Sequence, residues 1–323
     1  MASKKNSITH TRKKNKKMYC DQIYEKYIDP FTDFGFKKLF GEECNKELLL
    51  DFLNELLCKD QGRIVKISYL NSERLGFSSK SRRVVFDIHC ENDKGEKFIV
   101  ELQKEDQPFF KDRSVFYSTF PIVEQAPKGM RWNYKLKAVY VVAILDFVFE
   151  EDHDEPLKYR YDVMLTDIEN HKIFYDKLTF IYLAMPKFNK EIDELETNFE
   201  KWMYVIKNLS RFDDIPDKLR NRIFKKIFAA AEVANLTPEE YRDYLDNINA
   251  YRDWYNVMDK AVAKGLAKGL AKGLAEGKVE GKAETLECVV LDAKHSSFSI
   301  HQIQSITKLS EDQIIEILTK HGC

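Results

Sequence analysis

The chain has 323 residues, its formal net charge is −1, and 44% of its residues are hydrophobic. This length holds two domains, or one domain with extensions, and the apolar fraction suffices for a hydrophobic core, which excludes a disordered protein. A net charge near zero excludes nucleic-acid binding by overall charge, so any such surface must be local. The six cysteines form no CxxC pair, which excludes the common zinc motifs and favours a reducing, cytoplasmic location.

The N-terminal segment, residues 1–19, is basic and contains no acidic residue. It has two interpretations, a flexible solvated tail or an arm that contacts phosphates without sequence preference. It lacks the apolar core of a signal peptide. The longest apolar run, residues 138–145, is far shorter than the roughly 20 residues of a membrane helix, so we expect no membrane partner.

Residues 29–41, DPFTDFGFKKLFG, predict a short helix capped by Thr32 or Asp33, with its aromatic side chains in the core. Lys37 and Lys38 are candidate phosphate contacts, and solvated positions without a function are the alternative. Residues 45–58 have the apolar spacing of an amphipathic helix, and residues 62–71 predict a first strand. The acids expected along the surface of the second helix are Glu47, Asp51 and Glu55.

Residues 82–103 predict two strands joined by a tight turn, in which Gly95 supplies a positive φ. Side chains of each strand alternate between the two faces of the hairpin. On one face of the first strand the alternation places Phe86, Ile88 and Cys90. The other face of that strand carries polar residues, Asp87 among them.

The register of this hairpin sets two acids against each other. Because Asn92 is expected opposite Glu96, counting back along both strands places Asp87 directly opposite Glu101. Cross-strand partners have Cβ atoms about 5 Å apart, and like charges there are destabilising. A shared proton or a divalent cation would offset the repulsion, and two carboxylates suit Mg²⁺, with Mn²⁺ and Ca²⁺ as alternatives. His89 shares this face, where a partly buried, hydrogen-bonded histidine is expected in preference to a metal ligand.

Residues 109–125 predict a helix that Pro121 bends or ends. Arg113 and Tyr117 are four residues apart and therefore lie on one face of it. An arginine paired with a carboxylate and a packed tyrosine are the alternatives to a functional role. Residues 135–149 hold an apolar run that predicts a central parallel strand.

The rest of the chain changes from strands to helices. Strands are predicted at residues 160–167 and 178–185, and helices at 191–209, at 215–233 and after Thr237. Residues 263–284 repeat every four residues with glycine in each repeat, which indicates either a mobile helical linker or a helix for oligomerisation or for docking to another helix. Residues 299–321 predict two short helices with capping boxes, similar to a helix-turn-helix but with few basic residues.

Four segments carry a family resemblance: DPFTDFGFKKLFG at 29–41, FDIHCEN at 86–92, FIVELQ at 98–103 and FFKDRSVFYSTF at 109–120. In this order they resemble the Rpn family of recombination-promoting nucleases, also called PD-(D/E)xK family transposases. Asp87, Glu101 and Gln103 match the metal-site motif of PD-(D/E)xK nucleases. The wider superfamily has Lys where this chain has Gln103, and the Rpn-like branch tolerates Gln there.

The resemblance implies an α/β, restriction-endonuclease-like core, with a mixed sheet flanked by helices, followed by an all-α C-terminal region. It implies a DNA endonuclease in which Asp87 and Glu101 hold Mg²⁺ and Gln103 orients the attacking water or a phosphate oxygen. The residues expected to contact DNA or its phosphates are Lys37, Lys38, Arg113 and Tyr117. Because Gln103 stands where the wider superfamily has lysine, the alternative is a catalytically silent DNA-binding or protein-interaction module.

We expect the chain to have five parts. These are a basic tail over residues 1–19, a nuclease-like domain over 20–186, a helical region over 187–260, a glycine-repeat helix or linker over 261–284, and a helix-turn-helix-like tail over 285–323. DNA is the expected partner, and the glycine-repeat segment is the expected site of any association between copies of the chain.

Overall fold

A computed structural model describes residues 25–74, 84–105, 107–126, 133–152 and 154–322. The predicted basic tail over residues 1–19 lies outside the described residues. The chain divides into two compact units, Met1–Ala250 and Tyr251–Cys323.

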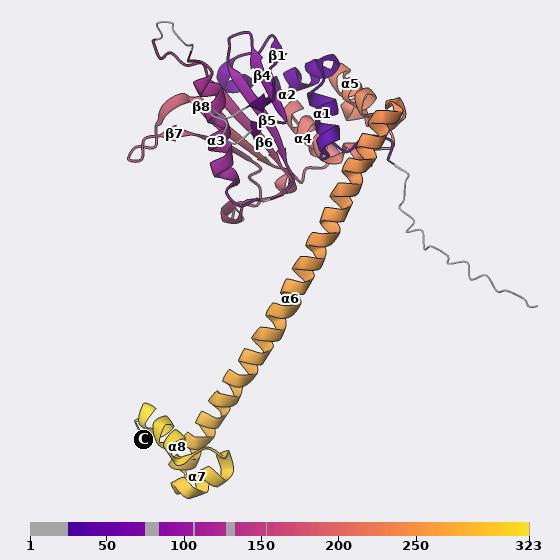
Figure 1. The fold of residues 1–323 in the computed structure, drawn as a ribbon. Helices are drawn as coiled ribbons and strands as arrows, with labels where there is room; N and C mark the ends of the chain where they lie inside the picture. Colours follow the sequence, from indigo (N-terminus) through magenta and orange to yellow (C-terminus); the bar gives the residue numbers. More distant parts are fainter. Residues whose placement is uncertain (1–24, 75–83, 106, 127–132, 153, 323) are drawn as a thin grey trace, which may run out of the picture. The chain divides into compact units, whose positions relative to one another are not determined.

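The first unit is built around a six-stranded sheet with strand order β1-β4-β5-β6-β8-β7 (Figure 1). Its strands are β1 (Ile67–Tyr69), β4 (Ile88–Asn92), β5 (Lys97–Gln103), β6 (Val139–Leu145), β7 (Arg160–Thr166) and β8 (Ile173–Ala184). The sheet is mixed, because β5, β6 and β8 are parallel whereas β1, β4 and β7 pair antiparallel with their neighbours. A separate two-stranded sheet joins β2 (Glu73–Arg74) to β3 (Val84–Val85).

The centre of the large sheet is β6, and all seven of its residues are buried. Its parallel neighbours and the helices on both faces leave no solvated side, which explains the continuous apolar run. The prediction of a central parallel strand is therefore confirmed. The strands predicted at residues 160–167 and 178–185 extend the same sheet as β7 and β8.

Helices cover both faces of the sheet (Figure 1). One face is covered by α3 (Phe110–Val123), whose Phe110 and Phe120 pack with Ile99 of β5. The helices packed against the opposite face are α1 (Asp33–Phe40), α2 (Lys46–Gln61), α4 (Asn198–Asn208) and α5 (Arg222–Ala231). Trp202 of α4 is fully buried there and anchors this helical layer. Thr32 caps α1 by accepting a hydrogen bond from the N–H of Gly35, as predicted.

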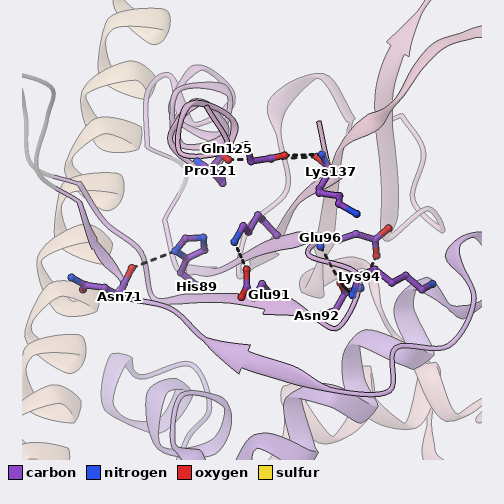
Figure 2. A network of polar contacts seen from close by, with 10 residues as sticks. Asn71, His89, Glu91, Asn92, Lys94, Glu96, Pro121, Gln125 and Lys137 are labelled. Atoms are coloured by element: carbon purple, nitrogen blue, oxygen red, sulfur yellow. Dashed lines mark hydrogen bonds and ion pairs between the residues drawn. The ribbon is translucent and has the colours of Figure 1, made fainter. Parts of the chain in front are cut away.

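The hairpin between β4 and β5 has the predicted register. Ile88 pairs with Val100, and the backbone N–H of Asn92 donates to the carbonyl of Glu96 at 3.1 Å. The Asn92 side chain closes the turn by accepting from the N–H of Glu96 and donating to its carboxylate (Figure 2). Gly95 has a φ of 78°, which glycine adopts at little cost.

The first strand of the predicted hairpin is interrupted, and this corrects one expectation. The chain leaves the small sheet after Val85 and enters the large sheet at Ile88. Phe86 therefore packs beside Ile99 under α3, whereas Ile88 and Cys90 face the other helices. The prediction that Phe86 shares a face with them was wrong, because the change of sheet breaks the two-residue alternation immediately before Asp87.

The first strand is also shorter than residues 62–71. Ile64 is buried, yet its backbone N–H and carbonyl are bonded by the side chain of Asn54, at 2.8 and 2.9 Å. Because the Asn54 side chain satisfies both backbone groups of Ile64, they do not require hydrogen bonds to a neighbouring strand. Only Ile67–Tyr69 joins the sheet as β1.

Helix α6 (Pro238–His295) begins at the predicted capping box, where Thr237 and Glu240 exchange hydrogen bonds of 2.8 and 3.2 Å. Its later part carries the glycine repeat and belongs to the second unit. There Val290 packs with residues of α7 (Ile300–Thr307) and α8 (Glu311–Lys320), both of which start at the predicted capping boxes. Within the described ranges, no helix combines the length and the apolar character that crossing a membrane requires.

Candidate active site

The two predicted acids lie together across the β4–β5 pair. Asp87 directly precedes β4, and continuing the observed register places it opposite Glu101. The backbone N–H of Asp87 donates to the Glu101 carboxylate at 3.2 Å. The N–H of Leu102 donates to the Asp87 carboxylate at 2.8 Å. Each acid is therefore positioned by the backbone of the opposite strand.

Burial makes this pair electrostatically unfavourable when both acids are ionised. It raises the pKa of Asp87, although the Leu102 N–H and the charge of Lys37 act in the opposite direction. Glu101 is only 7% exposed. Burial first, and then the charge of Asp87, raise the pKa of Glu101 well above its usual range. A proton or a cation is needed between the two groups to relieve the repulsion.

The donor set suits a hard divalent cation. Carboxylate oxygens are the preferred ligands of Mg²⁺, which keeps several of its water ligands and often takes only one or two protein carboxylates. Among the described residues, no cluster of three or more His, Cys, Asp or Glu side chains is arranged to hold a metal ion. Water and phosphate oxygens would complete the coordination of an ion at Asp87 and Glu101.

Gln103 lies on the same face of β5 as Glu101, two residues further along. Its carbonyl oxygen accepts a hydrogen bond from the Arg113 guanidinium, and its amide nitrogen donates to the carbonyl of Glu105 at 2.9 Å. Arg113 also donates to the side chain of Gln107 at 2.5 Å. The Gln103 amide thus fixes the arginine beside the two acids.

Tyr117 supports this arrangement from α3. The Arg113 guanidinium lies 5.7 Å from the centre of its ring. The ring also makes an edge contact with Phe86, at 5.3 Å between centroids. Tyr117 therefore packs against both the arginine and the bend that precedes Asp87.

The two predicted lysines of α1 have different surroundings. Lys37 pairs with Asp33 at 2.7 Å, and its charge lowers the pKa of both Asp87 and Glu101. Lys38 bonds to Glu42 and Glu240, at 3.0 and 2.5 Å, and is largely buried. It joins α1 to the first turn of α6.

A cavity of about 580 Å³ lies beside Asp87, lined by α1, Phe86 and the first turns of α6. Asp33 lines it together with Lys37, and its charge raises the pKa of Asp87. Sequence reasoning considered Asp33 only as a helix cap. The signal that was available is its spacing of four residues from Lys37, which places both on one helix face.

The acids of α2 lie outside the site, as expected. Glu47 pairs with Arg222 and Lys226, and Asp51 accepts a hydrogen bond from the Trp202 indole at 2.8 Å. Glu55 accepts from Asn198. These acids connect α2 to the helices packed around it.

His89 is buried, and its Nδ1 lies 3.3 Å from the carbonyl oxygen of Asn71 (Figure 2). The predicted hydrogen bond is present, and the burial of His89 is more complete than the partial burial that was predicted.

A second group of charges at the ends of β5 and β6 was not predicted. The N–H of Asp146 donates to the carbonyl of Gln103 at 2.9 Å. Burial, with the charge of Asp29 in addition, raises the pKa of Asp146 to about 6. Burial also raises the pKa of Asp29 and lowers that of Lys104. Because these residues are distant in sequence, no local pattern indicates the cluster.

A mixed sheet flanked by helices, with paired acids on adjacent strands and a helical C-terminal region, defines a restriction-endonuclease-like protein. Residues 30–261 match the family model described as PD-(D/E)XK nuclease family transposase. The chain belongs to this family, which confirms the resemblance of its four segments. No curated protein and no solved structure matches the chain.

Proposed function

We propose that this protein is a divalent-metal-dependent DNA endonuclease. The observation that carries the proposal is the cross-strand pair of Asp87 and Glu101, whose burial raises both pKa values. Two buried carboxylates of like charge next to each other are unfavourable for folding. Pairs of this kind with perturbed pKa values are concentrated at functional sites, where the negative potential they create binds a ligand. A divalent cation is the species that this field binds best.

The residues around the pair have distinct proposed roles. Asp87 and Glu101 would hold Mg²⁺, with Mn²⁺ or Ca²⁺ as possible substitutes. Bound there, the ion would lower the pKa of a water and offset charge on the attacked phosphate. Arg113, fixed by Gln103, stabilises the charge that develops on the phosphate. Lys37 contributes positive charge from the opposite side of the site.

Gln103 acts through Arg113 in this proposal. An amide does not titrate, so it takes no proton from water, and both of its polar atoms are already bonded. Tyr117 keeps the guanidinium in place. The proposed reaction is hydrolysis of a phosphodiester bond. The word transposase in the family's description then refers to the context of the family and not to a strand-transfer reaction.

Plasmid cleavage tests the proposal. Wild-type protein should nick or linearise supercoiled DNA in Mg²⁺ and should be inactive in EDTA. Asp87→Asn and Glu101→Gln should each reduce the rate by at least about 100-fold, the scale of losing one electrostatic group in an active site. Glu169→Gln, an exposed acid beyond β7, is the control and should retain full activity. Cleavage that survives both active-site substitutions would reject this site.

The second candidate is a catalytically silent module, and the engaged Gln103 amide is the observation that favours it. Calorimetric titration with Mn²⁺ separates the two functions. A nuclease should bind the ion in the wild type and lose binding in Asp87→Asn. A silent module should show no binding that depends on these carboxylates.

We also propose that α6 associates with a second copy of itself. Three leucines spaced four apart are about two-thirds exposed or more: Leu266, Leu270 and Leu274. An antiparallel pair of α6 helices would bury these leucines against one another and remove their side chains from water. Light scattering should show a dimer that Leu270→Glu converts to a monomer, and a dimer that persists in this variant would contradict the interface.

A further inference from the structure

Phe109 has an unfavourable position that the fold nevertheless maintains. It directly precedes α3, its φ is 66°, and its side chain is 78% exposed. A left-handed backbone disfavours any residue with a Cβ, and exposure of a phenylalanine ring to water is also unfavourable. Both features raise the free energy of the folded state. Residues held in this way point to a function for the exposed group.

The backbone that presents Phe109 is tied to the candidate active site. The N–H of Arg113 donates to the carbonyl of Phe109 at 2.9 Å, and the N–H of Phe110 donates to that of Gln107 at 3.1 Å. The Arg113 side chain bonds Gln107 on one side and Gln103 on the other. One arginine therefore joins the loop that carries the exposed ring to the strand that carries Glu101.

The surface around Phe109 combines aromatic rings with charged side chains of both signs. A cavity of about 580 Å³ lies on one side, lined by Phe109, Phe116, Arg113 and Tyr117 among others. Phe116 is 45% exposed. A smaller hollow on the other side of Phe109 is lined by Lys111, Phe149, Glu150 and Glu151, and Lys111 pairs with Glu151. One acid, Asp112, also lines the larger cavity.

Exposed aromatic rings beside an arginine, here Phe109 and Phe116 beside Arg113, are the chemistry that recognises single nucleic-acid strands. Aromatic side chains stack on the faces of bases, and nearby basic groups follow the phosphates. In duplex DNA the faces of the bases are covered by their neighbours, so exposed rings gain no such contact. A protein partner would require a continuous apolar surface, whereas the exposed Phe109 is separated from Val115 and Phe116 by exposed charged residues.

We propose that Phe109 and Phe116 form a stacking surface for unpaired bases next to the scissile phosphate. The substrate class is DNA with unpaired nucleotides, such as single strands, frayed ends and flaps. This inference deepens the proposed nuclease function and rests on it for the position of the scissile phosphate. The binding of unpaired bases by Phe109 stands on the exposed ring and its connection to Arg113.

Fluorescence anisotropy in EDTA tests this binding without cleavage. A short single-stranded oligonucleotide and its duplex are compared on wild-type protein and on Phe109→Ala, Phe116→Ala and Phe109→Trp. Each alanine variant should weaken single-strand binding by about 5- to 150-fold, the range for losing one stacked base, and should change duplex binding less than twofold. Phe109→Trp should retain the wild-type affinity. A fluorescent adenine analogue in the oligonucleotide should be quenched by wild-type protein and not by Phe109→Ala.

The matched control is Phe174→Ala, because Phe174 is 82% exposed on β8 and lies outside the α3 surface. It should bind both oligonucleotides normally. Equal losses for single strands and duplex, or no loss in Phe109→Ala, would overturn the inference. A change in self-association with unaltered DNA binding would assign the rings to a protein contact instead. If wild-type protein binds single strands through Phe109 but cleaves no DNA, the nuclease function fails while the stacking surface stands.

Discussion

The charge at Asp146 should make the stability of this protein depend on pH. Burial raises the pKa of Asp146 from 3.8 to about 6. The folded state therefore binds a proton more tightly than the unfolded state, so stability is highest below the unfolded pKa and falls as pH rises through the folded pKa. The difference of about 2 pKa units corresponds to about 3 kcal/mol once pH exceeds both values.

Asp146→Asn removes this charge and keeps the backbone N–H that bonds Gln103. We expect the variant to exceed the wild type in unfolding free energy by up to about 3 kcal/mol near pH 8, by about half as much near pH 5, and by nothing near pH 3. Urea denaturation at these pH values measures the difference directly.

The comparison has an internal control, because a substitution that merely improved packing would stabilise the protein equally at all pH values. A pH-independent gain would refute the electrostatic argument. So would a loss of stability near pH 8, which would mean that attraction to Lys104 outweighs the cost of burial. Glu169→Gln, at an exposed acid beyond β7, is the matched control variant.

Three further predictions concern other parts of the first unit. Glu101→Gln should raise the stability of the metal-free protein near neutral pH, because it removes the cost of burying this carboxylate and its repulsion from Asp87. It should also abolish any rise in melting temperature caused by Mn²⁺, and a destabilised variant would contradict the electrostatic argument. Asn54→Ala should lower the unfolding free energy, measured by urea denaturation, by about 1–3 kcal/mol, because it leaves the buried backbone N–H and carbonyl of Ile64 without hydrogen-bond partners. A neutral effect would show that water replaces the lost hydrogen bonds. Phe109→Gly should preserve the unfolding free energy or raise it by about 1 kcal/mol, because glycine accepts a φ of 66°, and it should weaken single-strand binding as much as Phe109→Ala does. A marked loss of stability would show that the ring stabilises the fold.

Sequence patterns alone predicted much of the local structure. The turn at Gly95 and the alternation of the second strand set the register that places Asp87 opposite Glu101. Helix caps at Thr32, Thr237 and Ser299 were identified from residues within one helical turn of each other. These features depend on interactions between near neighbours, which one stretch of sequence contains in full.

The tertiary structure decided how those pieces are used. Phe86 changes faces because the chain passes between two sheets, and β1 is short because Asn54 of α2 bonds the backbone of Ile64. The Gln103 side chain accepts a hydrogen bond from Arg113, and the charge of Asp29 adds to the effect of burial on the pKa of Asp146. Each of these outcomes depends on groups from different elements meeting in space. The periodicity of one stretch of sequence does not show which residues of different elements come into contact. The burial and the charges at those contacts determine the pKa values of the site.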